Sequence, residues 1–225
     1  QLLGGIAAVV FIAGAWLLKM PEKAAGKQLD DQEGDVPTRE MIKKISFWKL
    51  FAFFTLLAAV GSAAIGFGKD YFLSVGLAEG AAVTVAGLLS IFNGLGRIVS
   101  GMAFDKLGLR KAQILTSAVA ILSPALALLA ILLHAGWLGV IGLCLCGFTY
   151  GFSPTMSAAL VAAFYGNKYF PLNFPVLNLV LIPASFSSTL AGALVTASGS
   201  YLSTFVVLTV LSVVGLAVNL SIKKA

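Results

Sequence analysis

Long apolar segments follow one another along this chain and leave few folds open to it. A helix needs about 20 apolar residues to cross a hydrocarbon core about 30 Å thick. Seven segments meet or approach that length: Gln1 to Leu18, Phe47 to Phe67, Ala81 to Phe104, Ala112 to Leu133, Trp137 to Phe164, Phe174 to Ala197 and Tyr201 to Ile222. With 59% hydrophobic and 11% charged residues, the composition is far from that of a soluble domain. The sequence predicts an all-α, polytopic membrane helix bundle.

The chain divides into three parts by composition. No initiator methionine or basic stretch precedes the first apolar segment, so we interpret residues 1–18 as a truncated membrane span rather than a signal peptide. Residues 19–46 are polar and of mixed charge, which predicts a flexible surface linker that ends in a short amphipathic helix at Arg39 to Ile45. Residues 47–225 then form a six-helix transmembrane domain.

Lysine and arginine are distributed unevenly between the two sides of these spans. If the linker is cytoplasmic, thirteen of the 15 basic residues share its side, Lys69 is alone on the other side, and Arg97 lies within a span. The positive-inside rule therefore places the linker and the C-terminus in the cytoplasm, in a plasma or inner membrane. The basic residues occupy short loops rather than a patch with interleaved aromatics, so we expect lipid headgroups and no nucleic acid as partners.

Arg97 lies in the third apolar segment, where a guanidinium costs about 3 kcal/mol even on lenient insertion scales. Ser90, Gly94 and Gly101 share its helix face, with Asn93 one turn earlier, so this stripe is expected to face protein or a cavity rather than lipid. No Asp, Glu or His occurs in any other predicted span. A planar guanidinium suits a carboxylate, so we predict that Arg97 and Asn93 bind a small organic anion. The alternative is a structural arginine that snorkels toward the cytoplasm or pairs with an acid outside this chain.

A loop motif follows that span: Gly101-Met-Ala-Phe-Asp105-Lys-Leu-Gly108-Leu-Arg110-Lys111. It resembles the Gly-x-x-x-Asp-x-x-Gly-x-Arg-Lys/Arg signature of the major facilitator superfamily, in the copy that joins the eighth and ninth helices. We expect Asp105 to cap or pair with the next helix and with Arg110, and Gly108 to allow a tight turn. These residues would form a gating motif that latches one helix against another in one conformation. The alternative is an ordinary basic cytoplasmic turn.

The resemblance implies the C-terminal six-helix half of a twelve-helix carrier, plus the sixth helix and the central linker. The missing N-terminal half would be its partner, and a monomer is expected. The Asn93-to-Gly101 segment and the turn Phe164-Tyr-Gly166-Asn-Lys168-Tyr-Phe are similar to the oxalate/formate antiporter family and its lactate or monocarboxylate relatives. That likeness implies that Arg97 binds the substrate carboxylate.

Two departures from related patterns refine the expected substrate. Dicarboxylate exchangers of this kind carry a second cation in the eleventh helix, whereas the sixth apolar segment here offers only Asn178, with Asn173 before it. One guanidinium matches one carboxylate, so monocarboxylates are favoured over oxalate. Monocarboxylate transporters pair such an arginine with an aspartate one turn earlier, where this chain has Asn93, so proton coupling would use the absent half or the substrate's own proton.

The fifth apolar segment supplies further candidates. Phe148, Thr149 and Tyr150 lie beside glycines and Pro154, which invite a bend, so these three residues could wall a substrate pocket or simply pack. Cys144 and Cys146 are interpreted as buried small hydrophobes rather than metal ligands. No phosphate-binding loop and no acid/base cluster is present, so we expect no enzyme, no catalytic residue, no metal and no cofactor.

The sequence thus predicts a secondary active transporter of small organic anions, monocarboxylates such as lactate, formate or pyruvate. It would work by alternating access, as an antiporter or coupled to protons. The alternative is a membrane sensor or scaffold that keeps the carrier fold without transport.

Overall fold

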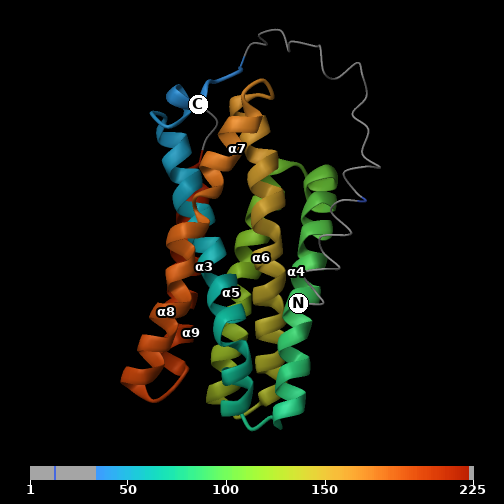
Figure 1. Cartoon of the computed structure of the whole chain (residues 1–225), viewed down its shortest axis with the longest axis vertical. Helices are drawn as coiled ribbons and strands as arrows, with labels where there is room; N and C mark the ends of the chain where they lie inside the picture. The colour runs from blue at the N-terminus through green and yellow to red at the C-terminus, as the bar shows by residue number, and fades with distance from the viewer. Residues whose placement is uncertain (1–12, 14–33, 223–225) are drawn as a thin grey trace. The chain divides into compact units, whose positions relative to one another are not determined.

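The structure, a computed structural model, describes Ala13 and residues 34–222. Most of the predicted first span and most of the predicted linker therefore lie outside the described residues. The regular elements of the described part are α-helices, which confirms the predicted all-α bundle (Figure 1). They are α2 (Thr38–Met41), α3 (Ile45–Ser74), α4 (Glu79–Leu107), α5 (Leu109–Leu132), α6 (Gly136–Tyr165), α7 (Phe170–Asn178), α8 (Leu181–Ser198) and α9 (Leu202–Ser221).

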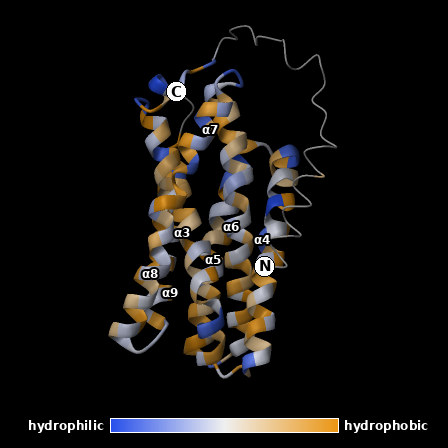
Figure 2. Ribbon diagram, viewed as in Figure 1, coloured by the Kyte–Doolittle hydropathy of each residue, from blue (hydrophilic) through white to orange (hydrophobic). Residues whose placement is uncertain are grey.

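Within residues 34–222, six segments are long and apolar enough to span a bilayer, with α7 and α8 together forming one of them. Figure 2 shows apolar residues along the helices and hydrophilic ones gathered toward one end. We call this the basic end, since its helix ends and turns carry Lys49, Lys106, Arg110, Lys111 and Lys168. Trp48 is exposed at the basic end and Trp137 at the opposite end, as expected of residues at the two membrane interfaces. The chain is an integral, multi-pass membrane protein.

Helix α3 is the central helix of the bundle. In its most apolar window 61% of the residues are buried, against 17% in α4 and 17% in the span formed by α7 and α8. Helices α4 and α8 lie on opposite flanks of α3 and α6 (Figure 1). Among the described residues, these two flanking helices therefore keep the least covered faces.

The sixth predicted span, Phe174 to Ala197, is not one continuous helix. It begins earlier, at Phe170, and breaks after Asn178, where Leu179 and Val180 form a turn between α7 and α8. Pro183 lacks the N–H that would bond the Leu179 carbonyl, and the amide of Val180 bonds the Leu177 carbonyl only three residues back. The missing donor and the tightened turn account for the break.

Two serines bind α8 to α3 beyond this break. The hydroxyl of Ser187 donates to the Ala59 carbonyl over 2.8 Å, and that of Ser188 donates to the Ser62 carbonyl over 2.9 Å. Gly66 leaves room for Ser188, because a Cβ at Gly66 would lie 2.6 Å from its Oγ. Ser187 and Ser188 thus hold α8 against α3.

The described end of the predicted linker is folded onto the bundle. The predicted helix at Arg39 to Ile45 is present only as α2, Thr38–Met41, and α3 begins at Ile45. The amide of Val36 donates to the Tyr165 carbonyl over 2.9 Å. Residues 34–46 therefore belong structurally to the helix domain, although their polar composition suggested a loose strand of chain.

Candidate functional site

Arg97 lies where α4 crosses α6 at close range. Gly96 of α4 faces the carbonyl oxygen of Phe148, and Gly151 of α6 faces the carbonyl oxygen of Asn93, at contacts that leave no room for a Cβ. The hydroxyl of Thr155 reaches the Arg97 carbonyl over 3.5 Å. Because backbone meets backbone on both sides, the turn that carries Arg97 is held firmly against α6.

The side chain of Arg97 points out of this contact and is exposed. Within residues 34–222 its guanidinium has neither a hydrogen bond nor an ion pair, whereas Lys69 and Glu79 do form an ion pair, at 3.1 Å. That the open side of Arg97 binds a small organic anion, rather than an acid outside this chain, stays a prediction.

The predicted stripe of small residues packs against the described helices only at Gly101, near Thr155. Ser90 and Gly94 are exposed, and a Cβ at Gly94 would meet no atom within 4 Å. Close packing is instead provided by Gly96 on α4 and by Gly147 and Gly151 on α6, although the glycines of α6 were expected only to invite a bend. The signal was available, because Gly147-Phe-Thr-Tyr-Gly151 is a pair of glycines four apart, a pattern typical of close helix packing in membranes.

The structure brings together three of the predicted substrate-binding residues. Asn93 and Arg97 lie one turn apart on α4, and the backbone of Phe148 lies against Gly96 between them. The side-chain oxygen of Asn93 is buried without a hydrogen-bond partner. The ring of Phe148 is half-buried and packs edge-on against Phe152, with 5.0 Å between the centroids.

The other three predicted residues lie apart from this group. Thr149 is 0% exposed, and its hydroxyl has no partner, so it faces no solvent in this conformation. Tyr150 packs on another side of α6, against Gly61 of α3 and near Ala184 of α8. Asn178 is half-buried at the end of α7. Within residues 34–222, no side-chain contact joins these three residues to Arg97.

The predicted gating motif forms the turn between α4 and α5. Gly108 has a φ of +74°, which confirms that a glycine is needed there. In this conformation α5 has no side-chain cap, and Asp105 forms no ion pair with Arg110 within residues 34–222, so the expected role of Asp105 in a gate stays a prediction. Gly101 is half-buried near Thr155, and Lys111 is exposed.

Arg110 instead caps the end of another helix. Its Nη1 donates to the Asn219 carbonyl over 2.8 Å, and its Nη2 to the Leu220 carbonyl over 3.0 Å. Lys49 of α3 donates to the Ser221 carbonyl over 2.9 Å. The last carbonyls of α9 thus receive two cations, an arrangement that the helix dipole favours. The motif ties α5 to α9 within this domain.

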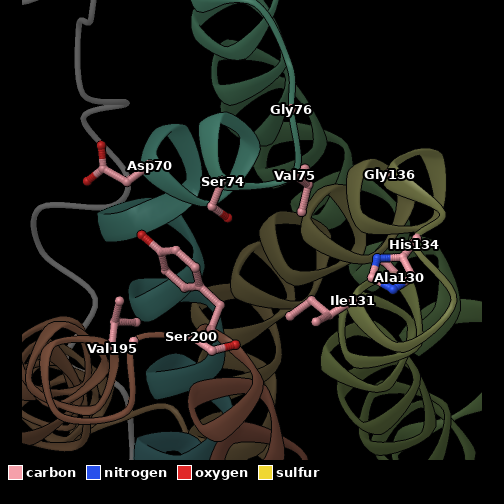
Figure 3. A pocket seen from close by; sticks show the side chains of 12 residues that line it. Asp70, Ser74, Val75, Gly76, Ala130, Ile131, His134, Gly136, Val195 and Ser200 are labelled. Atoms are coloured by element: carbon pink, nitrogen blue, oxygen red, sulfur yellow. The ribbon is translucent and has the colours of Figure 1, made fainter.

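A cavity of about 760 Å³ lies at the opposite end of the bundle (Figure 3). Asp70, His134 and Tyr201 are among its lining residues, and none of the predicted site residues lines it. Burial, and secondarily the charge of Asp70, raises the pKa of the Tyr201 phenol, which therefore stays neutral at physiological pH. Among residues 34–222, no group of three or more His, Cys, Asp or Glu side chains is placed to hold a metal ion.

Replacing His134 with glycine is expected to stabilise the protein by about 1 kcal/mol. His134 follows the last turn of α5 with a φ of +51°, a conformation that glycine adopts without steric cost. The midpoint of thermal unfolding, measured in detergent, is expected to rise by about 3 °C. As the control, Leu133→Gly changes a neighbour with an ordinary φ of −96° and is expected to lower the midpoint. An unchanged or lower midpoint for His134→Gly contradicts the strain argument.

Comparison with known proteins agrees with this architecture. The family model described as Major Facilitator Superfamily matches residues 1–174. A protein described as an uncharacterized MFS-type transporter, YhjX of Escherichia coli (strain K12), is 28% identical over 178 residues. That match covers 78% of this chain and 44% of the relative, so the chain spans less than half of the relative's length.

Proposed function

The chain belongs to the major facilitator superfamily, and from that premise we propose that it is the C-terminal part of a secondary active transporter of small organic anions. The exposed guanidinium of Arg97 is the observation that carries this proposal. It sits on a membrane-crossing helix, on a turn held rigidly by Gly96 and Gly151, and has no partner in the described structure. Keeping a cation unpaired at such depth is costly, and a transported anion would neutralise it.

A monocarboxylate such as lactate, formate or pyruvate fits this site best. Arg97 offers a planar fork to one carboxylate. The span formed by α7 and α8, on the other flank of the bundle, contains no lysine or arginine that would meet a second carboxylate. Asn93, one turn from Arg97, supplies a neutral amide. A second cation at this position would favour a dianion, and an acid would form a proton-bearing pair with Arg97.

Alternating access would use the two least covered helices of the domain. Helices α4 and α8 flank α3 and α6, and rocking of this domain against a second half would open a path along those faces first to one side of the membrane and then to the other. The coupling is anion exchange or proton symport. The resemblance to the major facilitator superfamily implies that the basic end faces the cytoplasm. The excess of lysine and arginine at this end favours the same orientation.

Arg97→Gln is expected to lower counterflow of labelled lactate, formate or pyruvate at least tenfold in liposomes that contain the full carrier. Glutamine keeps a polar side chain but removes the charge that meets the carboxylate, and tenfold corresponds to about 1.4 kcal/mol of lost binding. Counterflow by Arg97→Lys is expected to lie between that of the unchanged carrier and that of Arg97→Gln, because lysine keeps the charge and loses the bidentate geometry.

Lys69→Gln is the matched control, since it removes one cation from the opposite end of the bundle, where Lys69 pairs with exposed Glu79. We expect its counterflow to equal that of the unchanged protein. Anion exchange that survives in Arg97→Gln overturns the assignment of Arg97. Anion binding without counterflow in the unchanged carrier favours the sensor or scaffold instead.

A further inference from the structure

An exposed surface at the basic end combines apolar and basic side chains where the chain enters the membrane. We call it the Trp48 patch; it consists of the exposed residues Arg39, Ile42, Lys43, Ile45 and Trp48 together with half-buried Lys44. Ile42 is 40%, Ile45 69% and Trp48 54% exposed. The patch spans α2, the following turn and the first turn of α3, so it lies at the boundary between a polar segment and a membrane span.

The backbone beneath the patch is fixed. Met41 and Phe47 point inward and are almost completely buried, so the exposed side chains emerge from the other side of the same segment. The indole Nε1 of Trp48 donates to the Ile42 carbonyl over 2.9 Å. The Trp48 ring also packs edge-on against Phe47, with 5.3 Å between the centroids. The apolar part of the patch is therefore a preformed surface rather than a set of freely moving side chains.

The charges of the patch have the opposite sign to anionic lipid. Within residues 36–69 the sequence holds one acid, Glu40, against the three cations Arg39, Lys43 and Lys44, and the preceding acid, Asp35, accepts the backbone amide of Lys168. None of the three cations forms an ion pair with a residue that the structure describes. A tryptophan side chain favours the boundary between headgroups and acyl chains, isoleucine side chains favour the acyl chains, and adjacent cations attract anionic headgroups.

We propose that the Trp48 patch is a binding site for anionic phospholipid, with the phosphate-bearing headgroup at Lys43, Lys44 and Arg39 and the acyl chains against Ile42, Ile45 and Trp48. This inference depends on membrane insertion and not on the transported substrate. A protein partner is disfavoured, because the patch opens directly onto a membrane-spanning helix. Each basic residue near the surface is expected to enrich anionic lipid about fivefold.

Fluorescence quenching by brominated lipids tests the proposal in the full carrier. The emission of Trp48 is obtained as the difference between the unchanged protein and Trp48→Phe. The vesicles are phosphatidylcholine that contains equal mole fractions of either brominated phosphatidylglycerol or brominated phosphatidylcholine. We expect clearly stronger quenching by the anionic lipid, and a preference that weakens as salt is added.

Lys43→Gln and Lys106→Gln form a matched pair, because both remove one exposed lysine from the basic end. Lys43→Gln is expected to reduce the preference for phosphatidylglycerol, and Lys43→Gln combined with Lys44→Gln to abolish it, whereas Lys106→Gln preserves it. Equal quenching by the two brominated lipids overturns the proposal. A preference that persists in the Lys43/Lys44 double variant overturns it as well, whatever the transport activity of either protein.

Discussion

Gly151→Ala is expected to destabilise the protein by about 3 kcal/mol, more than an added methyl group normally costs. A Cβ at residue 151 would lie 3.1 Å from the backbone nitrogen of Arg97 and closer still to the carbonyl oxygen of Asn93. Backbone atoms cannot rotate away as a flexible side chain does, so α4 and α6 must separate. The same displacement moves the turn that carries Arg97, which couples the stability of this crossing to the geometry of the proposed site.

Two buried cysteines in α6 provide the measurement. Cys144 and Cys146 are free and almost fully buried, so a thiol-reactive dye labels them only when the bundle opens. With labelling assigned to these residues by mass spectrometry, the midpoint of thermal exposure is expected to fall by about 10 °C in Gly151→Ala.

Gly94→Ala is the control for this substitution. It adds the same methyl group to α4, where the new Cβ meets nothing within 4 Å. Alanine has the higher helix propensity, so its midpoint is expected to stay equal or rise slightly. If both variants lose stability equally, the loss does not come from the α4–α6 contact, and the close crossing is refuted.

The helices were predictable because apolar length determines what can cross a bilayer. The predicted span Ala81 to Phe104 appears as Glu79–Leu107, and the added residues are polar ends that continue the helix beyond the apolar core. The same reason extends Phe47 to Phe67 as far as Ser74, past Lys69 and Asp70. Apolar composition did not indicate the break between α7 and α8, because the two helices together are apolar enough to form one span.

The arrangement of the site was harder to predict from the sequence. That Arg97 would lack an acid in the other spans followed from composition alone, because no other predicted span contains one. The direction of Thr149 and Tyr150 did not follow, since α6 is apolar on every side and lipid is as apolar as the protein interior. In such a helix no polar face distinguishes the residues that meet a solute path from those that meet a neighbouring helix, and only the packing of glycines against α4 and α3 separates them.

The folded end of the linker was unpredictable for a different reason. Its polar residues are typical of a loop, and their partners are remote in sequence: Thr38 donates to the side chain of Asn173, 135 residues away. Local pattern carries no information about such a contact. Asn173 itself was noted only as an uncharged residue before a span, although it is 0% exposed and holds the linker through both ends of its amide.

Asn173→Leu is expected to release residues 34–38 from the bundle. The Asn173 side chain accepts the Thr38 hydroxyl over 2.7 Å and donates to the Val36 carbonyl over 2.9 Å. Leucine fills similar volume but leaves both groups without a partner, at a combined cost of about 3 kcal/mol. Hydrogen exchange at the Val36 amide, which bonds Tyr165, is therefore expected to accelerate about a hundredfold.

Asn178→Leu is the matched control, because it makes the same change five residues later on α7, where the structure describes no hydrogen bond to the side chain. Exchange of a peptide that covers residues 34–44 is expected to stay slow in this control and to become fast in Asn173→Leu, while peptides from α5 and α9 keep their protection in both. Faster exchange throughout the domain would mean general unfolding rather than release of the linker. Unchanged protection in Asn173→Leu would show that the buried Met41 and the bond between Val36 and Tyr165 hold the segment without Asn173.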